Sequence, residues 1–246
     1  MTAFAAAIAL AASPATAAGH DNTVFRENFD RLPVGPVTQG HGWTTDAAGG
    51  TLAIEPSRTG HGRELHIRTA GNGRAFLVIP APAASGNSFW VRARLRVAEF
   101  PTAPDWAHWT IAEASGSGSP TLVRPLGGQY VPSSGANFFG VGSDLGPTGD
   151  WTAWQTSAPA VAGKWRCVEF HLDATDNRVT VYLDGVEQTA LTVSTKQHGG
   201  APGDFLFPDF TTLKLGWQLY QPNPAPSSYD VRLDDLAVSP HRLGSH

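Results

Sequence analysis

The sequence has very little sulfur. Its 246 residues include one cysteine, Cys167, and one methionine. A single cysteine excludes an intrachain disulfide, so stability must come from core packing, helped at most by a bound metal ion. Lysine is also scarce, with three positions beside fourteen arginines, and the formal net charge is −4. Because the basic residues are scattered, we expect no nucleic-acid partner.

Long hydrophobic runs are missing beyond residue 20. The run before it, residues 3–12, is followed by small residues and resembles the apolar core and cleavage site of a secretory signal. We therefore expect a signal peptide over residues 1–18. The positively charged n-region that usually begins such a signal is missing, which is the pattern expected of a signal peptide truncated at its N-terminus. The run is too short for a stable membrane anchor. The mature protein is expected to be secreted, monomeric and without a membrane partner.

No long segment shows helical periodicity, whereas 27 glycines and 19 prolines separate short alternating runs. This pattern is typical of an all-β sandwich or barrel. We predict a single domain over residues 21–240, folded as a two-sheet antiparallel β-sandwich of the jelly-roll, concanavalin-like kind. Its first and last strands are expected to be neighbours. The expected strands are 23–29, 51–55, 63–69, 74–79, 88–98, 107–114, 137–142, 165–173, 178–184, 211–220 and 229–238.

The segment 211–221 is the most informative strand. Its leucines and Trp217 alternate with Lys214, Gly216, Gln218 and Tyr220, which places an apolar row on one face and a polar row on the other. The polar row offers an ammonium, an amide and a phenol, and we interpret Gly216 as leaving room above the backbone. These groups can hold a sugar carboxylate and move a proton beside it.

Two further strands add candidate site residues. In strand 88–97, Arg92 and Arg94 share the polar face, and a guanidinium binds a carboxylate through two parallel hydrogen bonds. His108 begins the next strand. Strict alternation places Glu113 of that strand toward the core, where a carboxylate needs partners or a raised pKa; a bulge would turn it toward the polar face instead.

Segments 115–136 and 143–163 are rich in glycine, proline and serine, and we predict that they are long loops. Such loops often form binding walls. Gln129, Tyr130 and Trp154 are therefore candidate substrate-binding residues. Further tryptophans near the proposed cleft are expected to stack on sugar faces, namely Trp106, Trp109, Trp151 and Trp217.

Several motifs together resemble those of a known group of proteins. They are ENFD at 27–30, the hairpin W-x-C-V-E-F-H-L-D with V-T-V-Y-L-D-G, and LDDLAVS near the end. They are similar to concanavalin-like jelly-roll polysaccharide lyases of the alginate-lyase and glucuronan-lyase type. The chain also resembles the cellulose-induced secreted proteins of biomass-degrading fungi and actinomycetes, which share that fold.

The resemblance implies a site for β-elimination on a uronic-acid polymer. The family motifs R-x-E-x-R, Q-x-H and Y-x-K-x-G-x-Y-x-Q correspond to Arg92–Arg96, to His108 with Thr110, and to Lys214–Tyr220. Arg94 stands where the family has a carboxylate, and Gln218 stands where it has the catalytic tyrosine. The implied roles are carboxylate neutralisation by Arg94 or Arg92 with Gln218, proton transfer by Tyr220 and His108, and substrate binding by Lys214.

A separate pair of carboxylates indicates a structural metal site. Glu27 on the first strand and Asp235 on the last converge if those strands pair, and hard oxygen ligands suit Ca²⁺. The resemblance implies the same ion. The alternatives to a lyase are a non-catalytic carbohydrate-binding module for cellulose or hemicellulose, a retaining glycoside hydrolase, and a lamin-G-like adhesion domain.

Overall fold

The computed structural model describes residues 24–57, 61–82, 86–145, 148–149, 157–200 and 202–245. This part of the chain folds into β-strands and one short 3₁₀ helix, η3 (Thr189–Leu191). The strands are β1 (Phe25–Glu27), β2 (Gly35–Pro36), β3 (Gln39–Gly40), β4 (Trp43–Pro56), β5 (Arg63–Pro80), β6 (Phe89–Val97), β7 (His108–Ser117), β8 (Leu122–Val131), β9 (Ala136–Ser143), β10 (Arg166–Asp173), β11 (Arg178–Leu183), β12 (Val186–Glu187), β13 (Asp209–Leu219) and β14 (Ser228–Ser239).

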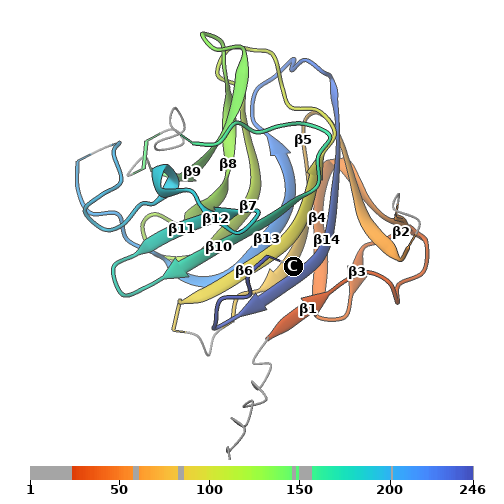
Figure 1. Ribbon diagram of the computed structural model, residues 1–246, viewed down its shortest axis with the longest axis horizontal. Helices are drawn as coiled ribbons and strands as arrows, with labels where there is room; N and C mark the ends of the chain where they lie inside the picture. Colours follow the sequence, from red (N-terminus) through yellow and green to blue (C-terminus); the bar gives the residue numbers. More distant parts are fainter. Residues whose placement is uncertain are drawn as a thin grey trace, which may run out of the picture.

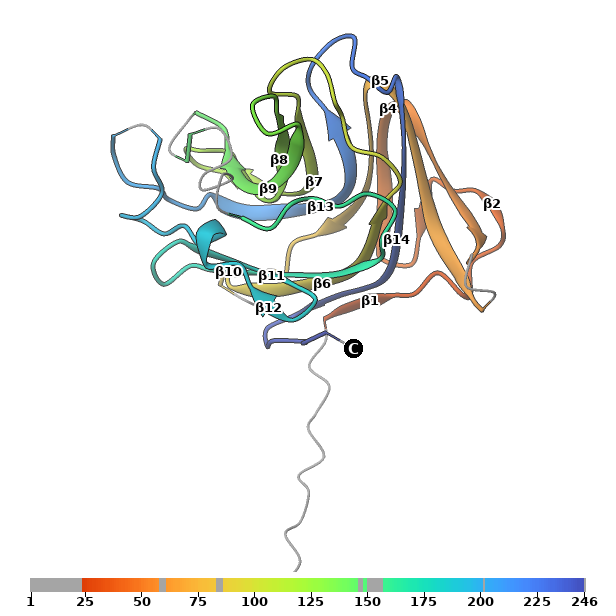
Figure 2. The same ribbon diagram turned by 45° about the horizontal axis from the view of Figure 1, so that its top comes forward.

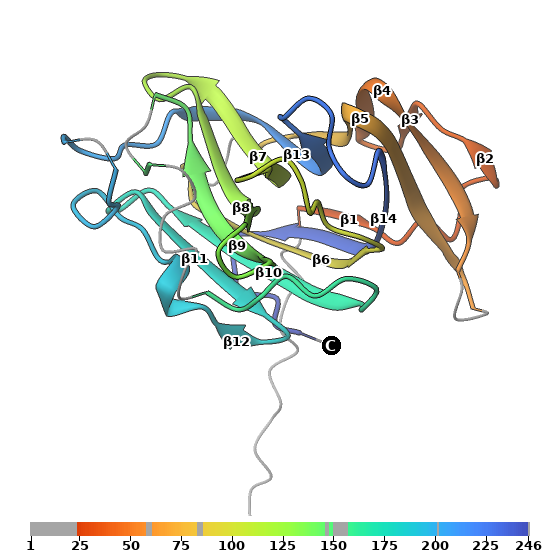
Figure 3. The ribbon, with the colours of Figure 1, turned by 90° about the horizontal axis from the view of Figure 1, so that it is seen from above.

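All strand pairs are antiparallel, and the main path through the sheet runs β12-β11-β10-β6-β14-β5-β13-β7-β8-β9. The sheet curls strongly, so that its two halves face each other as two layers (Figures 1 and 2). Seen from above, β8 and β9 cross over β10 and β11 (Figure 3), and β8 contacts both β10 and β11. The prediction of an all-β, two-layer antiparallel fold is confirmed.

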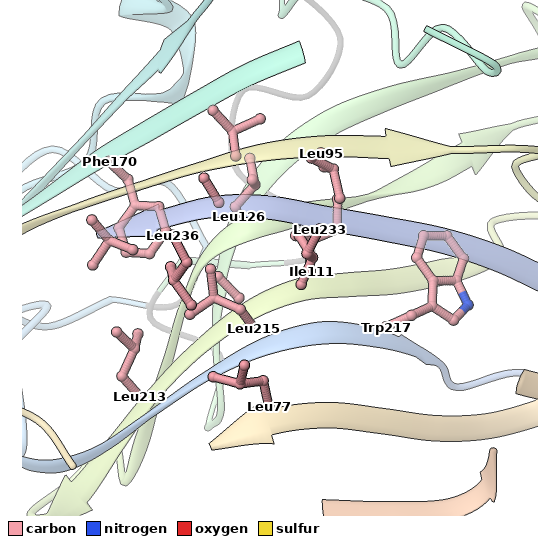
Figure 4. Packing of buried hydrophobic residues seen from close by; sticks show 14 of the residues in the cluster. Leu77, Leu95, Ile111, Leu126, Phe170, Leu213, Leu215, Trp217, Leu233 and Leu236 are labelled. Carbon is pink, nitrogen blue, oxygen red and sulfur yellow. The ribbon is translucent and has the colours of Figure 1, made fainter. Parts of the chain in front are cut away.

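The core lies between the two layers. Leu213, Leu215 and Trp217 of β13 are almost fully buried and face Leu95 and Leu233 of the opposite layer (Figure 4). Full burial of such side chains contributes roughly 1.5–3 kcal/mol each relative to exposure. The period-2 pattern therefore predicts correctly which face of β13 joins the core and which face points outward.

Several details of the predicted topology are confirmed. β10 and β11 form the predicted hairpin, with Phe170 opposite Val181. β1 pairs with β14 through Phe25 and Val238, so the first and last strands are neighbours. No helix of the described residues has the length and apolarity needed to cross a bilayer. The predicted signal peptide lies outside the described residues.

The largest error concerns the predicted loop 115–136. Residues 122–131 form strand β8, which pairs with β7 and β9. The segment Leu122–Val131 contains two adjacent glycines and a proline, which interrupt the alternation of apolar and polar residues. Its buried apolar side chains nevertheless pack into the core. In the same way, 63–69 and 74–79 are parts of one strand, β5, that continues through Gly71–Gly73.

Candidate functional site

The outer face of β13 carries a group of interacting polar residues that we call the β13 polar cluster. It is contributed by β13 and its neighbours on both sides, β7 and β5, together with the next strands, β8 and β4. The cluster consists of Asp46, Arg74, His108, Thr110, Glu113, Arg124, Gln129, Lys214, Gln218 and Tyr220.

An irregularity in β7 brings Glu113 into the cluster. The register of β7 shifts against β13 and against β8 between Thr110 and Ala112. As a result, both Thr110, opposite Gln218, and Glu113, opposite Lys214, lie on the outer face. A β-bulge reverses the alternation of side chains beyond it. The alternative considered for Glu113, a bulge that turns it away from the core, is therefore the one the structure contains.

Glu113 is surrounded by charges. It is 7% exposed, and its carboxylate lies 3.9 Å from the Lys214 ammonium. Burial raises the pKa of Glu113, while the positive charges of Lys214 and Arg124 oppose the shift. A carboxyl group whose pKa is raised by burial in this way is a candidate proton donor.

Lys214 also contacts a second carboxylate, with opposite consequences. Its ammonium lies 2.8 Å from Asp46, which also accepts a hydrogen bond from Arg74 Nε at 3.1 Å. Burial alone would raise the pKa of Asp46, but the hydrogen bonds and charges of Lys214 and Arg74 outweigh it and lower the pKa below the usual value. Asp46 is therefore ionised and Glu113 is biased toward protonation.

Tyr220 lies between a cation and a hydroxyl. Arg124 Nε donates to the phenol oxygen at 2.9 Å, and Thr110 Oγ1 lies 2.5 Å from the same oxygen. The Arg124 guanidinium also lies 5.4 Å from the centre of the Tyr220 ring. Burial raises the pKa of Tyr220, against the opposing charge of Arg124. The phenol is consequently protonated at neutral pH and able to donate a proton.

His108 is held at the same end of β13. Its Nε2 lies 2.8 Å from Gln129 Oε1, and its backbone N–H donates to Gln221 Oε1 at 2.6 Å. A bond from Nε2 to an amide oxygen assigns the ring proton to Nε2 and makes Nδ1 the basic nitrogen. The Tyr220 backbone N–H donates to the His108 carbonyl, so the two side chains are fixed on adjoining strands.

Two predicted site residues act differently from what we expected. Gly216 does not create space for a substrate: a Cβ there would lie 2.2 Å from the Ala75 carbonyl oxygen and 2.8 Å from Phe76 Cα. A glycine is required at position 216 because the backbone of β5 approaches too closely to leave room for a side chain. Gln129, predicted as a substrate-binding loop residue, is 2% exposed and holds His108. Gln218 lies opposite Arg74 and Thr110 and makes no side-chain hydrogen bond within the described residues.

Arg92 and Arg94 are not part of the cluster, which corrects the predicted catalytic combination with Tyr220 and His108. Both lie on the outer face of β6, which belongs to the other layer and is separated from β13 by β14 and β5. Arg92 donates to the Gly244 carbonyl at 3.0 Å, and Arg94 lies 3.9 Å from Asp235. The alternation of apolar and polar residues along a strand identifies which face of that strand points outward. It does not determine in which of the two layers the strand lies.

The predicted aromatic platform is largely core. Trp109 and Trp217 are fully buried and stack with ring centroids 5.7 Å apart, and Tyr130 is partly buried against the same core. Trp106 is 43% exposed. Trp154 and Trp151 lie outside the described residues.

The predicted calcium pair is not assembled as expected. The Glu27 carboxylate accepts hydrogen bonds from the Phe29 N–H at 2.8 Å and from Trp43 Nε1 at 3.1 Å, while the Asp235 carboxylate faces Arg94. Across the described ranges, no group of three or more His, Cys, Asp or Glu is arranged to hold a metal ion. Calcium binding stays a prediction from the resemblance, and no step below uses it.

Arg124, Asp46 and Arg74 are the residues that sequence reasoning missed. Arg124 was assigned to a loop because of the glycines and proline near it. Asp46 lies near the start of β4, where apolar and polar residues do not alternate regularly before Leu52, so the pattern predicts no strand there. Arg124 is five residues before Gln129, so alternation alone would place the two on opposite faces, and only the register shift of β8 between Arg124 and Gly127 brings both to the cluster.

No protein-family model matches the chain, and no curated protein sequence matches it. Among solved structures, it is similar to a chain described as a cellulose-induced protein, Cip1, with a TM-score of 0.61 and 19% identity, covering 84% of this chain and 94% of that one. It is also similar to a sialidase, with a TM-score of 0.51 and 13% identity, covering 89% of this chain and 19% of that one. A third similar structure concerns botulinum neurotoxin type C and its interaction with two ganglioside molecules; the TM-score is 0.51 and the identity 11%, covering 91% of this chain and 49% of that one. At these identities the likeness shows a shared fold, the jelly-roll-like β-sandwich.

Proposed function

We propose that the chain is a secreted polysaccharide-active protein, and most specifically a lyase that cleaves a uronic-acid polymer such as glucuronan by β-elimination at the β13 polar cluster. The observation that carries the proposal is the placement of the protonated Tyr220 phenol between Arg124 and Thr110, beside His108 on the adjoining strand. The fold shared with a cellulose-induced protein supports the polysaccharide class.

The chemistry requires three functions, and the cluster offers a group for each. His108 would accept the proton from the carbon next to the uronate carboxylate. Negative charge would develop on that carboxylate, where Arg124, assisted by Gln218, would stabilise it. The electron pair would form the carbon–carbon double bond as the glycosidic carbon–oxygen bond breaks, and Tyr220 would give its proton to the leaving oxygen. Lys214 would contact a neighbouring sugar.

A second enzymatic function is favoured by one observation. Glu113 and Asp46 both contact Lys214, and their environments move their pKa values in opposite directions. Such a pair can serve as acid and as nucleophile or base in glycoside hydrolysis. The raised pKa of Glu113 supplies the acid, which the sequence alone left without a partner.

One experiment tests these functions together. The secreted protein is incubated with glucuronan, alginate, pectate and cellulose, while ultraviolet absorbance of the unsaturated uronate and new reducing ends are measured in parallel. Elimination produces both signals, and hydrolysis produces reducing ends alone. Binding to a polymer without either signal would establish the non-catalytic carbohydrate-binding module instead.

A matched pair of arginine variants locates the activity. Arg124→Gln removes the cation that faces Tyr220 and should lower the elimination rate by about 10²-fold or more. Arg68→Gln alters an arginine whose side chain is 62% exposed on the outer face of β5 and should leave the rate unchanged. Equal rates in the two variants would contradict the assignment of the site.

A further inference from the structure

A second concave site lies on the other layer of the sandwich. A cavity of about 440 Å³ opens on the outer side of β6 and β10, within the size range of small-molecule sites. Figure 2 shows β6 and β10 in the layer opposite β13 and β7. The cavity is therefore separated from the β13 polar cluster by the whole core. Its lining residues are Arg94, Trp165, Arg166, Cys167, Asp184 and Ser245.

Arg94 supplies a cation whose hydrogen-bonding groups are not committed. Its guanidinium lies over the Trp165 ring, 5.2 Å from the centroid, and its side chain is 40% exposed. The nearest carboxylate, that of Asp235, is 3.9 Å away, which is beyond hydrogen-bond length. No hydrogen bond of Arg94 is found among the described residues. Stacking on an aromatic ring fixes the plane of a guanidinium while leaving its N–H edge free to bind a carboxylate.

The opposite wall carries an ion pair and therefore no net charge. Arg166 Nη1 lies 2.6 Å from Asp184 Oδ2, and the other oxygen of Asp184 accepts the Cys167 backbone N–H at 2.9 Å. Arg166 and Asp184 thus neutralise each other, and Arg94 is the cation that a ligand meets. One such cation matches the single carboxylate of one uronate sugar.

The segment after β14 completes the cavity. Buried Glu169 of β10 accepts the Leu243 and Gly244 backbone N–H groups at 3.0 and 2.9 Å and Arg242 Nε at 3.0 Å. Arg92 donates to the Gly244 carbonyl. These bonds hold the segment against β6 and β10 and place Ser245 in the wall. Arg92, which the sequence indicated as a substrate residue, therefore helps to build this site.

We propose that this cavity binds a carboxylate-bearing sugar of an acidic polysaccharide, with Arg94 as the residue that recognises the carboxylate. Trp165 fixes Arg94 and adds aromatic surface to the wall, while Asp184 and Ser245 offer an acceptor and a hydroxyl to the sugar. The site would hold the polymer without cleaving it. The proposal concerns binding and does not depend on lyase activity at the β13 polar cluster.

Calorimetric titration with a short glucuronate oligomer tests the proposal. The Arg124→Gln variant, in which elimination at the β13 polar cluster is slowed, is the reference, so that the oligomer is not consumed and the cavity is assessed from the change in affinity that each added substitution causes. Adding Arg94→Gln should weaken binding about tenfold or more, as expected when a charge-assisted hydrogen bond is lost. Arg94→Lys keeps the charge without the planar fork and should give an intermediate affinity. Adding Arg68→Gln is the control and should change nothing.

The outcomes separate this proposal from the proposed function. Loss of affinity in Arg94→Gln establishes the cavity site even if no polymer is cleaved. Equal affinity of the Arg94→Gln and Arg68→Gln variants would overturn it, even if elimination is observed. Equally tight binding of a cello-oligomer or a sulfated oligomer would overturn the assignment of a carboxylate ligand.

Discussion

Two groups of buried charged residues on this sheet differ in how closely their opposite charges approach each other. On β4, β5 and β14, His66 lies 2.8 Å from Glu55 and 2.6 Å from Asp230, and Arg232 pairs with Glu55 at 3.1 Å and with Glu64. Glu64, His66 and Arg232 are at most 2% exposed. The hydrogen bond from His66 is the main cause that lowers the pKa of Glu55. We call this group the β5 ion-pair network.

In the β13 polar cluster, by contrast, burial dominates over pairing at two positions. The pKa values of Glu113 and Tyr220 are both raised, although cations lie nearby. Groups whose pKa values are shifted by burial in a site mark functional sites more often than closely ion-paired charges do. This difference supports the chemistry proposed for the β13 polar cluster and a structural role for the β5 ion-pair network.

The largest expected effect is on catalysis. Tyr220→Phe removes the phenol hydroxyl but retains the ring beside Arg124, so the elimination rate should fall about 10²–10⁴-fold, the usual contribution of a general acid. The melting temperature should stay within a few degrees of wild type. Initial rates on glucuronan and a thermal melt measure both. Full activity in this variant would remove Tyr220 from the proposed mechanism.

The reciprocal substitution in the β5 ion-pair network should affect stability alone. Arg232→Met removes the cation and leaves Glu64 buried without a partner, which should cost about 3–5 kcal/mol of unfolding free energy. Denaturant titration measures the loss, with exposed Arg68→Met as the control, expected within about 1 kcal/mol of wild type. The elimination rate per folded molecule should not change. A large rate loss without destabilisation would show that the network has a chemical role.

A smaller effect is expected in the pH dependence of the rate. Burial is the main cause of the raised Tyr220 pKa, and the negative charge of Glu113 raises it further. Glu113→Gln removes that charge, so Tyr220 should lose its proton at a lower pH. The alkaline limb of the elimination rate profile should move to lower pH. New reducing ends without the ultraviolet signal in wild type, lost at every pH in Glu113→Gln, would instead favour Glu113 as the acid of a hydrolase.

The smallest expected effect tests whether a raised pKa is by itself sufficient to mark a site. Burial raises the pKa of Asp234 on β14 from 3.8 to about 6, although the hydrogen bond from the Asp235 backbone N–H opposes the rise. The folded state therefore binds a proton more tightly than the unfolded chain, and stability falls as pH rises from about 4 to about 6. Asp234→Asn should raise the melting temperature by about 2–4 °C near neutral pH and by nothing near pH 4. Activity should be unaffected, because Asp234 lies outside the β13 polar cluster.

Sequence periodicity was a reliable guide to single strands and to their faces. Alternation correctly identified the core residues of β13 and the hairpin of β10 and β11, since a side chain's face depends on its own strand. It was less reliable where glycine interrupts a strand, as in β8. It also could not assign Glu113, whose face depends on how β7 pairs with two neighbours.

The sequence alone determined the all-β class, the polar row of Lys214, Gln218 and Tyr220, and the arginine row of β6, because local alternation separates core from surface. The tertiary structure decided which rows meet. The curl of the sheet places Arg94 on one layer and Tyr220 on the other, and strand order rather than sequence distance brings Arg124 to the Tyr220 phenol. Membership of a site is a property of strand pairing and layer packing, which arise from contacts between segments far apart in the chain.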